Sequence, residues 1–179
     1  ANQIRKIEWL GNLEKLNKLY MYGNRIRKIE GLDNLVNLNL LDLEKNQISK
    51  IEGLENLSNL KQLSLRKNQI NKIEGLGKCS ALLELYLDHN KIEGGPAEVD
   101  LPPIKFLNLS NNPIEELPKK PHSDLFRVPH LNLSETNIKD INSLKQSVQE
   151  GKVVLWKTSE FNYGQNPNNK RFVQIDESR

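Results

Sequence analysis

The side chains that most often carry chemistry are few in this sequence. The three histidines are His89, His122 and His130, and the single cysteine is Cys79. Structural zinc sites place their cysteines and histidines in closely spaced pairs, and no such pair occurs here. The glycines do not form the pattern of a phosphate-binding loop either. The residue types and their spacing therefore predict no metal site, no cofactor and no catalytic activity.

Leucine and asparagine dominate the composition, with 29 and 23 of the 179 residues. Asparagine recurs every 22 residues, at Asn2, Asn24, Asn46, Asn68, Asn90 and Asn112. The register then lengthens by two residues and reaches Thr136. Each asparagine ends a frame of apolar residues such as Leu38-x-x-Leu41-x-Leu43-x-x-Asn46. Such a period is typical of solenoid proteins, in which every repeat is one coil of a stack.

The alternation within each frame predicts a short β-strand, with Leu19 and Met21 pointing into the core and Tyr20 outward. Because a strand with one apolar side cannot bury itself, neighbouring coils must stack and pair their strands in parallel. The asparagine after each strand should satisfy main-chain groups that leave the strand ladder. Cys79 aligns with Leu57, which predicts a buried thiol in the core and not a reactive nucleophile.

A second phrase, Lys50-Ile51-Glu52-Gly53-Leu54, recurs between the asparagines in three consecutive coils. Together with the leucine frame, it resembles the leucine-rich-repeat family in its short 22-residue class. The sequence of this phrase is most similar to the repeats of the regulatory subunit of protein phosphatase 1, and less similar to those of bacterial internalins. The resemblance implies an α/β solenoid: a right-handed curved stack of about seven short parallel strands, with short helical-turn or extended returns.

The repeats divide the chain into two parts. We expect residues 1–158 to form the solenoid, with about seven repeats of which the first is truncated, and residues 159–179 to form a C-terminal cap or a linker tail. The missing strand ahead of Asn2 indicates a fragment of a longer polypeptide. No apolar run approaches the roughly 18–20 residues that a membrane span needs, so we expect no membrane insertion.

The outward strand positions form three columns on the concave face of the predicted sheet, and they contain five of the ten aromatic residues. Aromatic side chains dominate the binding energy of protein interfaces, so we interpret this face as a partner-binding surface. The predicted binding residues are Tyr20, Tyr22, Asp42, Glu44, Arg66, Glu84, Tyr86, Asp88, Phe106 and Trp156. The alternative is that the aromatic side chains only pack against one another across strands.

These features predict a non-catalytic protein–protein interaction module. The resemblance extends this to a phosphatase-regulator-like scaffold, with a phosphatase catalytic subunit as one candidate partner. The alternative stays open that the chain is a targeting or substrate-recognition domain, either of a larger enzyme or of a bacterial surface or effector protein. The predicted face is balanced to slightly acidic, which argues against nucleic acid although the net charge is +3. We expect a monomer inside the cell, in the cytoplasm or nucleus, with secretion or surface display less favoured.

Overall fold

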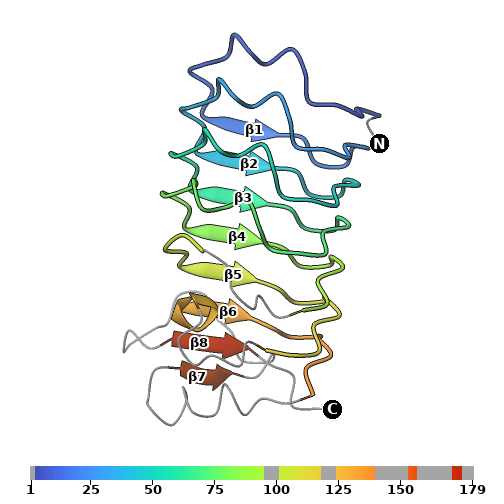
Figure 1. Cartoon of the computed structure of the whole chain (residues 1–179), viewed down its shortest axis with the longest axis vertical. Coiled ribbons are helices and arrows are strands. Elements are labelled where there is room, and N and C mark those ends of the chain that lie inside the picture. Colours follow the sequence, from blue (N-terminus) through green and yellow to red (C-terminus); the bar gives the residue numbers. More distant parts are fainter. Residues whose placement is uncertain (1–2, 95–100, 118–123, 140–152, 157–170, 175–179) are drawn as a thin grey trace.

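The strands form one parallel sheet along a stack of coils (Figure 1). The computed structural model describes residues 3–94, 101–117, 124–139, 153–156 and 171–174. Six strands follow one another along the stack: β1 (Lys18–Tyr20), β2 (Leu40–Asp42), β3 (Gln62–Ser64), β4 (Glu84–Tyr86), β5 (Phe106–Asn108) and β6 (His130–Asn132). Two more, β7 (Val153–Trp156) and β8 (Arg171–Gln174), give the order β1-β2-β3-β4-β5-β6-β8-β7. The predicted parallel-strand solenoid is confirmed.

The register between strands agrees with the 22-residue period. Leu19 pairs with Leu41, Leu41 with Leu63, and Leu63 with Leu85, each at the middle of its strand. From β2 to β6 this middle residue is buried, while its two neighbours in the strand are half-buried. Because a strand directs alternate side chains to opposite faces, each coil turns its leucines inward and a row of other residues outward.

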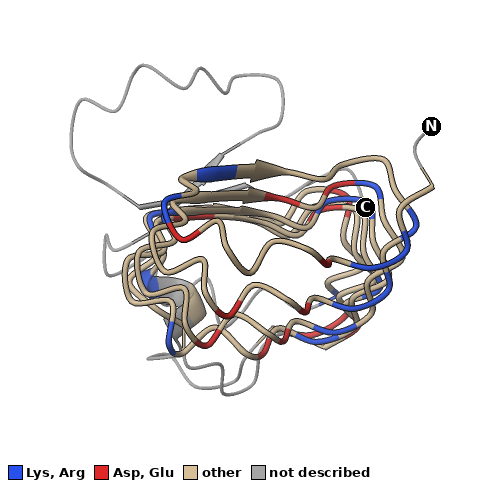
Figure 2. Ribbon diagram, turned by 90° about the horizontal axis from the view of Figure 1, so that it is seen from above, with Lys and Arg blue, Asp and Glu red and all other residues tan. Residues whose placement is uncertain are grey.

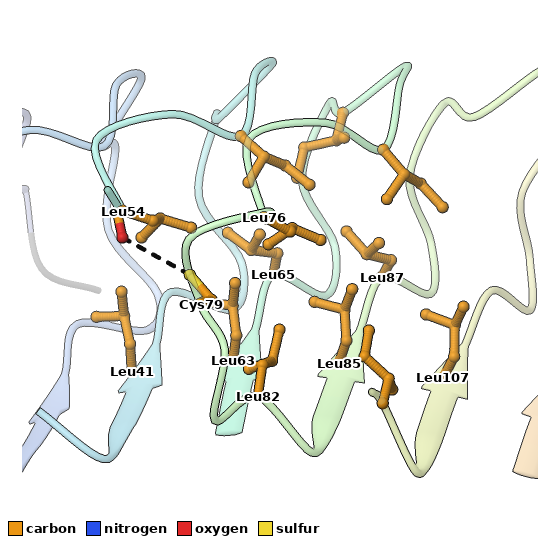
Figure 3. Packing of buried hydrophobic residues seen from close by; sticks show 14 of the residues in the cluster. Leu41, Leu54, Leu63, Leu65, Leu76, Cys79, Leu82, Leu85, Leu87 and Leu107 are labelled. Atoms are coloured by element: carbon orange, nitrogen blue, oxygen red, sulfur yellow. Dashed lines mark hydrogen bonds between the residues drawn. The ribbon is translucent and has the colours of Figure 1, made fainter. Parts of the chain in front are cut away.

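Columns of leucine and isoleucine fill the space between the strands and the returns (Figure 3). Leu41, Leu63 and Leu85 are all 0% exposed. Burying one such side chain stabilises the fold by about 1.5–3 kcal/mol, so the stacking of coils supplies most of the stability. The first coil buries its core positions less well, since Ile4 is 44% and Leu13 45% exposed. A coil is thus fully covered only between two neighbours.

The returns between strands consist of turns. In the second coil, the Leu35 N–H donates to the Leu32 carbonyl and the Leu38 N–H to the Leu35 carbonyl, both at 2.9 Å. The described returns contain no α-helix, and their one helical segment is the 3-10 helix η1 (Asp124–Arg127). Where the sequence predicted short helical turns, the described returns therefore contain a series of separate hydrogen-bonded turns. Across the described residues, no helix has the length and apolar character needed to cross a membrane.

The asparagines of the 22-residue period form a ladder inside the stack. The Oδ1 atom of Asn46 accepts a hydrogen bond from the Ile26 N–H at 3.0 Å, and its Nδ2 group donates to the Met21 and Leu43 carbonyls, both at 3.0 Å. The same pattern recurs at Asn68, Asn90 and Asn112. The predicted role of these amides is confirmed: they satisfy main-chain groups of their own coil and of the coil before it.

The C-terminal end of the sheet differs from the predicted stacking. We expected the strand of Trp156 to follow β6 directly, but β8 lies between β6 and β7. Through β8, Trp156 aligns with Gln174 and then with Asn132, and not with Ser134 as predicted. The sequence of β8, Arg-Phe-Val-Gln, lies outside the leucine period and gave no strand signal. Only the backbone of Trp156 is described, so its predicted role in binding stays a prediction.

Cys79 takes a leucine position in the core and is 0% exposed (Figure 3). Its thiol donates to the Leu54 carbonyl oxygen at 3.6 Å. Burial, together with the charge of Glu55, raises the pKa of the thiol from 9.0 to about 11. Because only the thiolate is nucleophilic, the folded protein should react with iodoacetamide about 100-fold more slowly than an ordinary cysteine does. Mass spectrometry should find Cys79 unmodified in buffer and alkylated in urea; rapid alkylation in buffer would contradict this burial.

Candidate functional site

The outward positions on β1 to β6, and those just after each strand, form one continuous surface, which we call the sheet face. The first column contains Lys18, Leu40, Gln62, Glu84, Phe106 and His130. The second contains Tyr20, Asp42, Ser64, Tyr86, Asn108 and Asn132, and the third Tyr22, Glu44, Arg66, Asp88, Ser110 and Ser134. Figure 2, seen along the stack, shows the strands on one side and charged segments along the returns. Paired strands lie about 4.8 Å apart, so neighbours within a column lie side by side.

Two tyrosines at the N-terminal end of the sheet face are open to solvent. Tyr20, the last residue of β1, is 57% exposed, and Tyr22 is 64% exposed. Neither ring packs against another aromatic ring among the described residues. The alternative that the aromatic side chains of this face only pack against one another therefore does not account for these two.

A second aromatic pair lies farther along the sheet face. The rings of Tyr86 and Phe106, on the neighbouring strands β4 and β5, have centroids 5.1 Å apart and an interplanar angle of 44°. Both residues are half-buried. The Tyr86 hydroxyl also donates to Glu84 Oε2 at 3.0 Å. For this pair the cross-strand packing alternative holds in part, because the two rings support each other while keeping some exposed surface.

A network of ion pairs crosses the third column. Arg66 Nε donates to Asp88 Oδ2 at 2.9 Å, and Arg66 Nη1 lies 3.8 Å from Glu44 Oε2. Lys67 Nζ lies 3.4 Å from the other oxygen of Glu44. Burial acts to lower the pKa of Arg66, but the hydrogen bond to Asp88 and the charges of Asp88 and Glu44 outweigh it and raise the pKa. The charge of Arg66 is thus engaged within its own chain.

Asp88 was predicted to contact a partner, yet its carboxylate lies inside the protein. It is 1% exposed, accepts hydrogen bonds from Arg66 and from Asn108 Nδ2, the latter at 3.1 Å, and lies 3.1 Å from His89 Nδ1. A buried carboxylate needs such partners, because an unpaired charge in the interior costs several kcal/mol. Asp88 therefore positions Arg66 and Asn108, which corrects its assignment as a contact residue.

Two carboxylates of the sheet face have no cation within ion-pair distance among the described residues. Asp42 Oδ1 accepts the Glu44 N–H at 2.9 Å, and Glu84 accepts the Tyr86 hydroxyl. Both carboxylates are half-buried. Burial lowers the pKa of His130 in the first column, so its imidazole is neutral at neutral pH and adds no positive charge.

Sequence reasoning missed the role of two asparagines. Asn108 Oδ1 accepts hydrogen bonds from the Ser110 N–H at 3.1 Å and from the Ser110 hydroxyl at 2.8 Å. Asn132 does the same with Ser134, at 3.0 and 2.8 Å. The repeated Asn-Leu-Ser phrase of these consecutive coils was the signal that could have shown it. Both serines are 6% exposed, so little of the third column is open to solvent beyond Arg66.

A cavity of about 410 Å³ lies in the returns ahead of β5 and β6, where it is lined by Leu101, Pro102, Pro103, Ile104, Lys105, Arg127, Val128 and Pro129. None of the predicted binding residues whose side chains the structure describes lines this cavity. In the part of the chain that the structure describes, no group of three His, Cys, Asp or Glu side chains is placed to hold a metal ion. The geometry of the predicted residues is that of an open surface, which suits recognition of a macromolecule better than enclosure of a small ligand.

Comparison with known proteins identifies the repeats. The family model "Leucine Rich repeats (2 copies)" matches residues 36–78, and the model "Leucine Rich Repeat" matches residues 103–124. No curated protein matches the sequence. The chain therefore contains leucine-rich repeats, as its leucine frame predicted, while the finer likeness to phosphatase regulators stays a prediction.

Several solved structures from bacteria have a similar fold. Internalin C2 of Listeria monocytogenes is 26% identical with a TM-score of 0.70, over 98% of this chain and 68% of that protein. Internalin F of the same organism is 29% identical with a TM-score of 0.53, over 80% of this chain and 36% of that protein. A leucine-rich-repeat protein of Leptospira interrogans, 23% identical with a TM-score of 0.60 over 78% of this chain and 42% of that one, shares the fold.

Proposed function

We propose that this leucine-rich-repeat chain is a non-catalytic module that binds a protein partner on its sheet face. The observation that carries the proposal is the exposure of Tyr20, the last residue of β1, and of Tyr22 just after it, at 57% and 64%, where β1 is paired with the strand of the next coil. Tyrosine is enriched among the residues that dominate binding energy. A hydrogen-bonded stack also loses little conformational entropy when it binds, so the two rings can act as preformed anchors.

Two finer assignments rest on different observations. The Lys-Ile-Glu-Gly-Leu phrase supports a phosphatase-regulator-like scaffold. Identities of 26% and 29% with internalins C2 and F support a recognition part of a bacterial surface or effector protein. Titration of the purified chain with a phosphatase 1 catalytic subunit separates them, because saturable binding is expected only for the first assignment and its absence would overturn that assignment.

Replacing Tyr20 and Tyr22 together by alanine should abolish partner capture with little change in thermal stability. Removing two anchoring rings should weaken binding by at least ~30-fold, the effect of about 2 kcal/mol at one hot spot. The measurement is quantitative affinity capture from cell extract, with melting temperatures determined in parallel. Val36, which is 44% exposed on a return, provides the matched control as Val36→Ala. Equal capture by the tyrosine variant and the control would contradict the proposal.

A further inference from the structure

The charge of the sheet face is opposite to that of the chain. From β1 to β6 its three columns contain two cations and four carboxylates, which gives −2 on a chain of net charge +3: Lys18 and Arg66 against Asp42, Glu44, Glu84 and Asp88. His130 adds no charge at neutral pH because burial lowers its pKa. The excess of negative charge therefore belongs to this surface in particular.

Internal ion pairs compensate only half of these carboxylates. Glu44 is paired with Arg66 and Lys67, and Asp88 is buried against Arg66. Asp42 and Glu84 accept only uncharged donors, a backbone N–H and a phenol hydroxyl, among the described residues. The uncompensated charge thus lies at two defined positions, one on β2 and one on β4.

Each of the two carboxylates without a cation partner among the described residues lies beside an aromatic ring. Asp42 pairs in register with Tyr20, and Glu84 pairs in register with Phe106, so in both cases the side chains are neighbours on the same face. A carboxylate next to an aromatic face is favourable for a guanidinium or ammonium group, which can form an ion pair with the first and a cation–π contact with the second.

We propose that the partner presents two basic side chains to the sheet face, one to the Tyr20–Asp42 pair and one to the Glu84–Phe106 pair. Two strand spacings across the sheet and two residues along it separate the carboxylates by about 12 Å. An extended peptide covers this distance in three to four residues, at about 3.3 Å each. This inference rests on the proposed function, and it specifies the partner as a basic segment, with arginine favoured over lysine because its planar cation stacks on rings.

Selection of peptides on the immobilised protein tests this chemistry without a known partner. The probe is a phage-displayed library of random dodecapeptides, and affinities of the enriched peptides are then measured by calorimetry. We expect enrichment of arginine and lysine three to four positions apart. The double variant Asp42→Asn and Glu84→Gln should bind the enriched peptides at least about tenfold more weakly, and raising the salt concentration should weaken binding to the unaltered protein.

The two substitutions are chosen to leave the fold intact. An asparagine at 42 and a glutamine at 84 can still accept the Glu44 N–H and the Tyr86 hydroxyl. Glu52→Gln is the control for charge, since Glu52 lies on a return with its Oε2 atom 3.7 Å from Lys50 Nζ. Equal binding to the double variant and to the control, or enrichment of peptides without basic residues, would overturn the proposal.

The same selection separates this inference from the proposed function. Peptides that lose affinity for the Tyr20 and Tyr22 alanine variant but carry no basic residues would keep the sheet face as a binding surface and overturn only the basic partner. Peptides that bind that variant as tightly as the unaltered protein, or a library that yields no enriched peptide at all, would contradict both.

Discussion

Replacing Asn68 by alanine should lower the free energy of unfolding by about 3–5 kcal/mol, because one amide side chain satisfies main-chain groups in two coils. Its Nδ2 group donates to the Leu43 carbonyl of the preceding coil at 3.0 Å, and to the Leu65 and Arg66 carbonyls of its own coil at 3.1 Å. Its Oδ1 atom accepts the Ile48 N–H at 3.0 Å. Alanine would leave the buried Ile48 N–H without a partner, at a cost of about 1–3 kcal/mol. The three carbonyls would each lose one of two hydrogen bonds, because Leu43 also accepts from Asn46, Leu65 from Asn90, and Arg66 from the Lys45 N–H.

Urea unfolding followed by circular dichroism measures this effect, and three further variants define its cause. Asn68→Asp keeps the shape but removes both amide donors, so it should be nearly as damaging. Asn68→Thr should be milder, because Thr136 occupies the same ladder position and donates to the Leu133 carbonyl at 2.8 Å. Asn71→Ala changes an exposed asparagine and should alter stability by less than about 0.5 kcal/mol. If Asn68→Ala were as mild as Asn71→Ala, the ladder would not hold the coils together.

The ladder and the core could be predicted because both repeat. A side chain that returns every 22 residues must have the same environment in every coil, so Leu63 or Asn68 can be placed by its period alone. Even a departure such as Cys79 follows from its column, and the structure places its thiol among leucines. Because the coils stack, each coil must place its leucines and its asparagine at the same positions as the coils beside it.

The sheet face could be located but not resolved into contacts, since its residues do not repeat. The period shows that Asp88 points away from the leucine core, yet its burial depends on Arg66, His89 and Asn108 from three different coils. The contact between Tyr86 and Phe106 likewise depends on two unrelated residues that happen to be neighbours across β4 and β5. Such contacts form only between stacked coils, so the sequence of a single coil does not determine them.

The insertion of β8 shows the same limit at the end of the sheet. Beyond the last clear leucine frame no column dictates which segment pairs with β6, and a four-residue strand such as Arg171–Gln174 carries too little pattern to be recognised. The unpaired backbone N–H and C=O groups at the edge of β6 can then form hydrogen bonds with any extended segment that reaches them.

Replacing Gly53 by alanine should destabilise the protein by about 3–5 kcal/mol, from backbone strain and overlap acting together. Gly53 has a φ of +68°, a left-handed conformation that costs a residue with a Cβ about 1–2 kcal/mol. An added Cβ would also lie 2.3 Å from the Ile29 carbonyl oxygen of the preceding coil. Because that obstacle is backbone and not a movable side-chain end, relief requires the two coils to separate.

Gly23 provides the matched control for Gly53, since the same substitution there tests strain without overlap. Its φ is also +68°, but an added Cβ would meet nothing within 4 Å, so Gly23→Ala should cost only about 1 kcal/mol. Trp9 takes the glycine position of the phrase in the first coil, with a φ of 66° and 89% exposure, and the described residues contain no coil ahead of it. A side chain is therefore compatible with this backbone when no carbonyl is stacked against it. Urea denaturation measures the free energy of unfolding of both variants. Equal losses of stability at Gly23 and Gly53 would mean that the positive φ alone selects glycine. A larger loss at Gly53 would show that close stacking of the coils requires glycine there.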